Sequence, residues 1–164
     1  MADKIRVVLA DDHVLVRQGI RQFLEDGDDI AVIGEAASGD EAVRLVEQLQ
    51  PDVALLDIQM PGMGGIEATR QIKARYPTVK VLILTAYDED PYVFALLKAG
   101  ANGYLLKTAE VDELLRAVRA VYRGESVLSP EVTDKVLRQF QSGRPALGAE
   151  QVEALTAREI EILR

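Results

Sequence analysis

Five short apolar runs, separated by longer amphipathic stretches, limit what this 164-residue chain can fold into. Most of the runs are continuously apolar rather than alternating, which is typical of strands buried on both faces of a parallel sheet. The stretches between them place apolar residues at helical spacing. The sequence therefore predicts an α/β domain with a five-stranded parallel sheet and helices on both faces. The predicted strands are Ile5–Ala10, Ile30–Ala36, Val53–Leu56, Val79–Leu84 and Gly103–Leu106.

Five helices are predicted to follow these strands in turn. Ser38 or Asp40 lies near the start of the second helix, as capping residues do. Glycine often follows the last helical turn, so we expect the fourth helix to end at Gly100 and the fifth near Gly124. The positions that mark the helices are, in chain order, Val14, Val16, Ile20, Phe23 and Leu24; Ala42, Val43, Val46 and Leu49; Ile66, Thr69, Ile72 and Lys73; Val93, Leu96 and Leu97; and Leu114, Leu115, Val118 and Val121.

The pattern changes after Gly124. Ser129-Pro130 predicts the start of a short helix, whose apolar positions suit packing on the preceding domain or a dimer contact. Thr156 and Glu159 have capping-box spacing and predict a later helix start. We therefore expect one domain over residues 1–124, a linker with a short helix over 125–150, and the truncated start of a further domain over 151–164. The apolar positions of the linker helix are Val132, Val136 and Phe140.

Composition excludes several classes of function. The chain has no Cys, so thiol catalysis, iron–sulfur clusters, Cys-zinc sites and disulfides are ruled out, and one His cannot form a His-rich metal site. The net charge is −8, and acidic residues outnumber basic ones on both sides of Gly124, so this chain by itself is expected to be a poor nucleic-acid binder. No targeting or membrane-spanning segment is found, which predicts a cytoplasmic protein with no membrane partner.

Polar side chains lie at the ends of four predicted strands. Asp11 and Asp12 follow the first strand, Asp57 the third, Thr85 the fourth and Lys107 the fifth. Ligands of open parallel sheets bind beyond the carboxyl ends of the strands, so these side chains are expected to face one crevice.

Their chemistry favours a cation and phosphorus. Close carboxylates raise one another's pKa or bind a cation, and ligands that are all oxygen favour a hard ion such as Mg²⁺. A carboxylate can also act as a nucleophile, while a Lys ammonium and a hydroxyl neutralise phosphoryl oxygens. Each residue also has an ordinary interpretation, as a helix cap or a solvated strand end, and His13 is expected to be a non-functional residue in the first turn of the first helix. The combination at four strand ends favours a site.

At these residues the chain resembles a known family. Asp11-Asp12, Asp57 with Met60-Pro61-Gly62, Thr85-Ala86 and Gly103-Tyr104-Leu105-Leu106-Lys107 resemble the receiver domain of two-component response regulators, over residues 4–123. Leu155-Thr156-Ala157-Arg158-Glu159 is similar to the opening of a LuxR-type helix-turn-helix domain. Together these resemblances indicate the NarL/FixJ class, with a flavodoxin-like fold.

The resemblance implies a role for each site residue. Asp57 would be the phosphoacceptor. Asp12, Asp57 and the backbone carbonyl of Gln59 would be Mg²⁺ ligands, with Asp11 acting partly through water. Lys107 would pair with the phosphoryl group.

The resemblance also implies a conformational switch, and the sequence differs from the family pattern at one position. Thr85 would hydrogen-bond the phosphoryl group, and Tyr104 would turn inward when Thr85 moves. Gln59 and Tyr87 would tune the loss of the phosphoryl group. Many receivers have Pro after the Lys, often with a cis bond, whereas Thr108 follows here; a cis bond there would cost about 3 kcal/mol.

The expected function is phosphorylation on Asp57 by a sensor histidine kinase. The result would be a homodimer that binds DNA through a complete C-terminal domain. One alternative is a protein-interaction module that works without phosphorylation. An independent phosphatase is disfavoured, because Gln59 stands where such chemistry usually has a second Asp and no GxxxxGK[ST] loop is present. Catalysis beyond self-phosphorylation and self-dephosphorylation is not expected.

Overall fold

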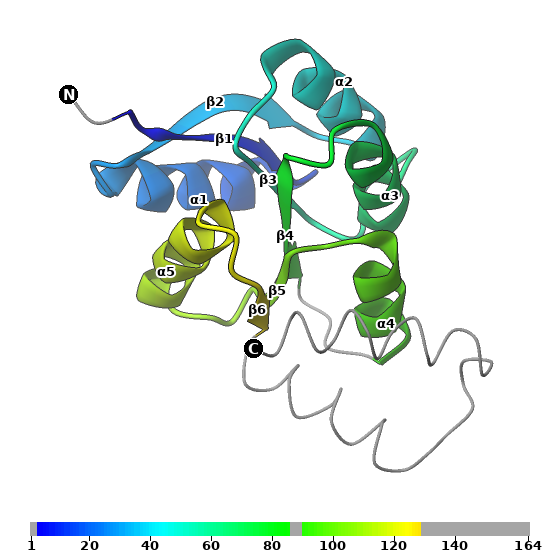
Figure 1. Cartoon of the computed structure of the whole chain (residues 1–164). Helices are drawn as coiled ribbons and strands as arrows, with labels where there is room; N and C mark the ends of the chain where they lie inside the picture. The colour runs from blue at the N-terminus through cyan, green and yellow to red at the C-terminus, as the bar shows by residue number, and fades with distance from the viewer. Residues whose placement is uncertain (1–2, 86–89, 129–164) are drawn as a thin grey trace.

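The computed structural model describes residues 3–85 and 90–128, and the side chains of residues 90–94 are left out of the description (Figure 1). The strands form one parallel sheet in the order β2-β1-β3-β4-β5-β6. The strands are β1 (Ile5–Ala10), β2 (Ile30–Ala36), β3 (Val53–Leu56), β4 (Lys80–Thr85), β5 (Gly103–Leu106) and β6 (Val127–Leu128). The helices are α1 (Val14–Asp26), α2 (Gly39–Leu49), α3 (Gly65–Arg75), α4 (Asp90–Ala99) and α5 (Val111–Tyr122).

The predicted α/β fold is confirmed, with one addition. All five predicted strands are present, and β4 begins at Lys80 rather than Val79 and includes Thr85. The sheet has a sixth strand that was not predicted: β6 pairs with β5 and lies in the segment 125–150 that was predicted to be a linker. Two residues are too few to produce a periodic pattern, so the sequence did not reveal this strand. The helix predicted at Ser129-Pro130, the linker at 142–148 and the helix start at Thr156 lie outside the described residues.

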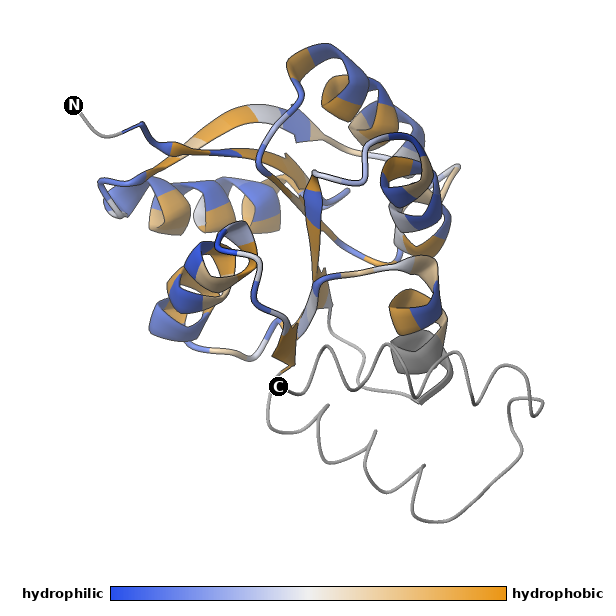
Figure 2. Cartoon of the chain, viewed as in Figure 1, coloured by the Kyte–Doolittle hydropathy of each residue, from blue (hydrophilic) through white to orange (hydrophobic). Residues whose placement is uncertain are grey.

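The sheet is covered on both faces, as its apolar strands predict. α1 and α5 pack on one face, and α2, α3 and α4 pack on the other (Figure 1). Side chains of each strand alternate between the two cores: Val53 and Leu55 face α1 and α5, whereas Ala54 and Leu56 face the other layer. Figure 2 shows the strands as mostly hydrophobic and the helices as mixed. Within the described ranges, no helix is both long enough and apolar enough to cross a membrane.

Of the two predicted caps of α2, Ser38 is the one that caps the helix. Its hydroxyl accepts a hydrogen bond from the backbone N–H of Glu41 at 3.2 Å. The Asp40 carboxylate instead accepts from the N–H of Met63 at 3.1 Å. Asp40 therefore links the start of α2 to the loop that leads from β3 to α3.

Two glycines allow this β3–α3 loop to lie against its surroundings. The N–H of Gly65 donates to the carbonyl oxygen of Ile58 at 2.8 Å, and a Cβ at Gly65 would lie 2.2 Å from the carbonyl oxygen of Asp57. The N–H of Gly39 donates to the carbonyl of Met63 at 2.8 Å, and a Cβ there would lie 2.0 Å from the same oxygen. The backbone that follows Asp57 is thus held where only glycine fits.

Gly65→Ala tests this close approach. A Cβ pushed onto the Asp57 carbonyl must displace backbone, so we expect the free energy of unfolding to fall by about 3 kcal/mol. Gly19→Ala is the matched control, because a Cβ there meets nothing within 4 Å in the middle of α1. That variant should be more stable by about 0.5–1 kcal/mol. Urea unfolding measures both, and equal stabilities of the two variants would contradict the packing described.

Candidate metal centre at the carboxyl edge of the sheet

The strand order brings the predicted acidic residues together. The chain passes from β1 through α1 to β2 and then back through α2 to β3 on the other side of β1. The strand order therefore reverses at β1, which places a crevice at the carboxyl ends of β1 and β3. Ala10 pairs with Leu56, which places the next residues, Asp11 and Asp57, side by side. The N–H of Asp57 donates to the carbonyl of Ala10 at 3.0 Å. Both carboxylates are buried.

Lys107 reaches the same point from the end of β5. Its Nζ donates to Asp11 Oδ2 at 2.9 Å and lies 3.3 Å from Asp57 Oδ2. The N–H of Lys107 donates to the carbonyl of Thr85 at 2.6 Å, which fixes where the side chain leaves the sheet. The described ranges contain no cis peptide bond, so Lys107 and Thr108 are joined by a trans bond. One ammonium group therefore links three strand ends.

The other predicted residues divide into a buried pair and an exposed pair. Thr85 and Tyr104 are fully buried, and the ring of Tyr104 belongs to the core that includes Leu96 of α4, so it already lies inside the protein. Asp12 and Gln59 are exposed at the rim. There a hollow of about 720 Å³ opens between Asp12 and the β3–α3 loop. Tyr87 lies outside the described residues.

The donor set fits a hard divalent cation. One ligand atom from each of Asp11, Asp12, Asp57 and His13 can be chosen so that all lie within 4.8 Å of one another. Three of these donors are carboxylate oxygens, the ligands that Mg²⁺ prefers. His13 is the member that sequence analysis set aside. It is the N-cap of α1 rather than a first-turn residue, and its Nδ1 lies 3.3 Å from Asp11 Oδ1 and 3.1 Å from Asp12 Oδ1.

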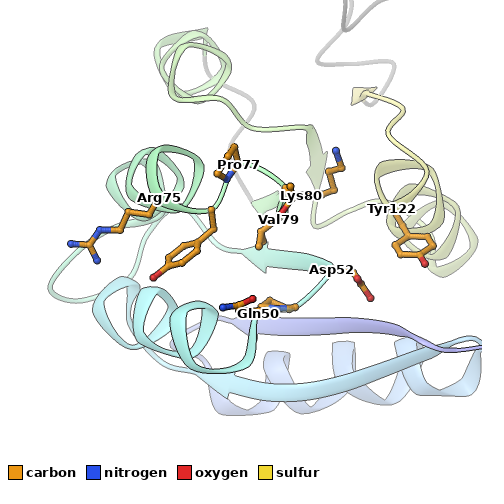
Figure 3. A pocket seen from close by; sticks show the side chains of 10 residues that line it. Gln50, Asp52, Arg75, Pro77, Val79, Lys80 and Tyr122 are labelled. Atoms are coloured by element: carbon orange, nitrogen blue, oxygen red, sulfur yellow. The ribbon is translucent and has the colours of Figure 1, made fainter.

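A second hollow, of about 370 Å³, lies at the opposite end of the sheet (Figure 3). It is lined by the turns that enter β3 and β4 and by the end of α5. Asp52, Lys80 and Tyr122 are among its lining residues. None of the strand-end residues predicted above lines this second hollow. The candidate metal centre therefore lies at the carboxyl edge of the sheet.

Comparison with known proteins agrees with this geometry. Residues 7–119 match the response regulator receiver domain. The chain belongs to the response regulator family. It is 48% identical over 160 residues to the transcriptional regulatory protein LiaR of Bacillus subtilis, covering 97% of this chain and 74% of that protein. It is 42% identical over 159 residues to the response regulator GacA of Pseudomonas viridiflava, covering 96% of this chain and 73% of that protein.

Solved structures of receivers share the fold. The signal receiver domain of NarL from Mycobacterium tuberculosis superposes with a TM-score of 0.74 at 38% identity, covering 76% of this chain and all of that one (100%). A LuxR-family two-component response regulator from Aurantimonas sp. SI85-9A1 gives a TM-score of 0.80 at 35% identity, covering 84% of this chain and 98% of that one. The fold of this receiver is thus flavodoxin-like, as the resemblance implied.

Burial and charge set the ionisation of the receiver site. Burial raises the pKa of Asp57, and the nearby Asp11 charge raises it further, against the opposing pull of Lys107. For Lys107, burial lowers the pKa, but its contacts with Asp11 and Asp57 outweigh burial and the net pKa is raised. Lys107 therefore stays an ammonium, while the charge of Asp57 is held at a cost to the folded state.

Arg17 supports the acidic pair from α1, and sequence analysis missed it. Its Nη1 donates to the carbonyl oxygen of Asp11 at 2.7 Å, and its Nε donates to Glu35 Oε1 at 3.0 Å. Arg21 binds the other oxygen of Glu35. A basic residue one turn into a helix is ordinary in sequence, and only the fold shows that its guanidinium reaches back to the backbone of Asp11.

Asp57→Asn tests the cost of the buried charge. Because the folded pKa of Asp57 is raised, its carboxylate destabilises the fold above that pKa, and the cost disappears as pH falls through it. Without metal at neutral pH, we expect the variant to be more stable by on the order of 1 kcal/mol. This difference in the free energy of unfolding between the variant and the wild type should disappear at acidic pH. Urea unfolding against pH measures this, with exposed Asp28→Asn as the control; a less stable Asp57→Asn variant at neutral pH would refute it.

Arg17→Ala tests the support of the acidic loop. Loss of the guanidinium frees the Asp11 carbonyl, so Mg²⁺ affinity should fall by about tenfold, as when an outer ligand support is removed. Arg21→Ala is the matched control, since Arg21 shares Glu35 but is not the donor to Asp11. An amide NMR titration with Mg²⁺ reads both affinities. An equal loss in the two variants would assign the effect to the ion-pair network rather than to Arg17.

Proposed function

We propose that this chain is a phosphorylation-dependent response regulator whose Asp57 accepts a phosphoryl group from a sensor histidine kinase. The observation that carries the proposal is the shared ammonium: Lys107 contacts both Asp11 and Asp57 where β1, β3 and β5 end. The family match supports it, because this arrangement lies inside the matched residues 7–119.

The transfer uses Asp57 as the nucleophile. An oxygen of its carboxylate forms a bond to phosphorus while the bond between phosphorus and the kinase imidazole nitrogen breaks, and the electron pair returns to the imidazole. Lys107 supplies positive charge next to the attacking carboxylate, and the Thr85 hydroxyl hydrogen-bonds a phosphoryl oxygen.

Asp12, Asp57 and the carbonyl of Gln59 would hold Mg²⁺, with Asp11 acting through water. When bound, the ion supplies positive charge to the phosphoryl oxygens. Self-phosphorylation and self-dephosphorylation are the only catalysis we propose. We place the protein in the cytoplasm with no membrane partner.

The new dianion changes the charge balance that Lys107 now satisfies with two carboxylates. It favours the one of two states in which Lys107 and Thr85 turn to the phosphoryl group, with Tyr104 following Thr85. The outcome is a homodimer that binds DNA through a complete C-terminal domain. Relatives support the DNA-binding part of this proposal: LiaR and DegU are described as transcriptional regulatory proteins, and a structure of RcsB from Salmonella typhimurium, 27% identical, concerns its DNA interaction.

The decisive experiment incubates the receiver with acetyl phosphate and Mg²⁺ and follows its mass. We expect one phosphoryl group on the wild type and on Asp28→Asn, none on Asp57→Ala, and none after chelation of the metal. A sizing experiment with beryllofluoride should show dimers. Labelling of Asp57→Ala as in the wild type would refute the proposal, and labelling or partner binding that needs no Mg²⁺ would favour the phosphorylation-independent module.

A further inference from the structure

His13 is the only histidine of the chain, and it lies at the solvent side of the acidic pocket. Its side chain is 68% exposed, while its Nδ1 faces Asp11 Oδ1 and Asp12 Oδ1 at 3.3 and 3.1 Å. As the N-cap of α1 it makes no capping hydrogen bond with its side chain to the described residues. The imidazole is therefore directed at the carboxylates rather than at the helix.

Lys107 and His13 take different oxygens of the cluster. Lys107 contacts Oδ2 of Asp11 and of Asp57, on the buried side, whereas His13 faces Oδ1 of Asp11 and Asp12. His13 Nδ1 thus faces one oxygen of the buried Asp11, which also accepts the His13 backbone N–H at 2.9 Å, and one oxygen of the exposed Asp12.

The spacing suits neighbouring ligands of one ion. With bonds of about 2.1 Å, adjacent ligands lie about 3.0 Å apart in an octahedral shell and about 3.4 Å apart in a tetrahedral one. The two nitrogen–oxygen distances of His13 fall between these values. An ion coordinated by the Oδ1 atoms would have Nδ1 at ligand distance without a large movement of the ring.

We propose that His13 is a direct ligand that makes this pocket selective for late first-row divalent cations such as Zn²⁺ over Mg²⁺. Imidazole nitrogen suits Zn²⁺, Cu²⁺ and Ni²⁺, whereas Mg²⁺ prefers oxygen; the affinity of a given N/O site rises from Mn²⁺ to Cu²⁺ and is lower again for Zn²⁺. Asp11, Asp12, Asp57 and His13 each offer one ligand atom within 4.8 Å of the others, so an ion bound through His13 would have a protein ligand at a position that Mg²⁺ usually leaves to water or a phosphoryl oxygen. It would then compete with Mg²⁺ and oppose phosphorylation. The inference rests on the acidic pocket of the proposed function.

The test compares the wild type with His13→Asn, which keeps a good N-cap and so should fold. Calorimetry should show Zn²⁺ affinity reduced by at least about tenfold, and Mg²⁺ affinity changed by less than about twofold. Since the chain has one imidazole and no thiol, ¹⁵N NMR of that ring gives a second readout. Zn²⁺ should shift the Nδ1 resonance, and Mg²⁺ should leave it in place. Asp28→Asn should behave as the wild type.

The outcomes separate the two proposals. An unchanged Zn²⁺ affinity in His13→Asn, an unshifted Nδ1 signal, or an equal loss of both metals overturns the role of His13 as a selective ligand. If the wild type is not phosphorylated by acetyl phosphate and Mg²⁺ but still binds Zn²⁺ through His13, the proposed function is overturned and the role of His13 as a metal ligand stands. Absence of binding of either ion to the wild type overturns the pocket, and the inference with it.

Discussion

The site depends on one ammonium group shared by two buried carboxylates. Asp11 and Asp57 are placed side by side by the pairing of β1 with β3, and two such charges out of water repel each other. Lys107 offsets this repulsion from the end of β5, a strand that is adjacent to neither β1 nor β3. It lies 96 residues from Asp11 and 50 residues from Asp57 in the sequence. A contact of this kind exists only when β1, β3, β4 and β5 lie side by side, so the site depends on the tertiary fold rather than on a local motif.

The pocket carries a net negative charge, and part of it lies at the solvent-exposed rim. Three carboxylates stand against one ammonium, with Asp12 and His13 at the exposed rim. The raised pKa of Asp57 shows that Lys107 does not fully compensate burial and the Asp11 charge. A bound cation would relieve the excess of negative charge, and under the proposed function a phosphoryl group would give Lys107 a new partner. The backbone after Asp57 is held by the close approach of Gly65 and by the hydrogen bond from its N–H to the Ile58 carbonyl.

The sequence predicted the fold and the site where the signal was strong, and it failed where the signal was short or spatial. Continuous apolar runs predicted the strands, and polar residues at their ends predicted the cluster of Asp11, Asp57 and Lys107. The two-residue β6 has no period to detect. Arg17 and His13 are ordinary in sequence, because the direction of a guanidinium or a ring follows from how α1 packs. The domain boundaries, the linker helix and the start of a DNA-binding domain stay predictions, as do the roles assigned to Thr85, Tyr104 and Gln59.

Lys107 at the crevice is connected through the backbone of β4 and β5 to the core on the α4 face of the sheet. The carbonyl of Thr85 holds the N–H of Lys107, and Thr85 pairs with Leu106 across β4 and β5. Two residues before Leu106 on β5, the ring of Tyr104 is packed in the core with Leu96 of α4. The backbone of Lys107 is thus joined to the strand pair that carries Tyr104, and a fully buried ring cannot change place without repacking the side chains around it, those of α4 included. Under the proposed function, the α4 side of the sheet is therefore the surface that we expect to respond.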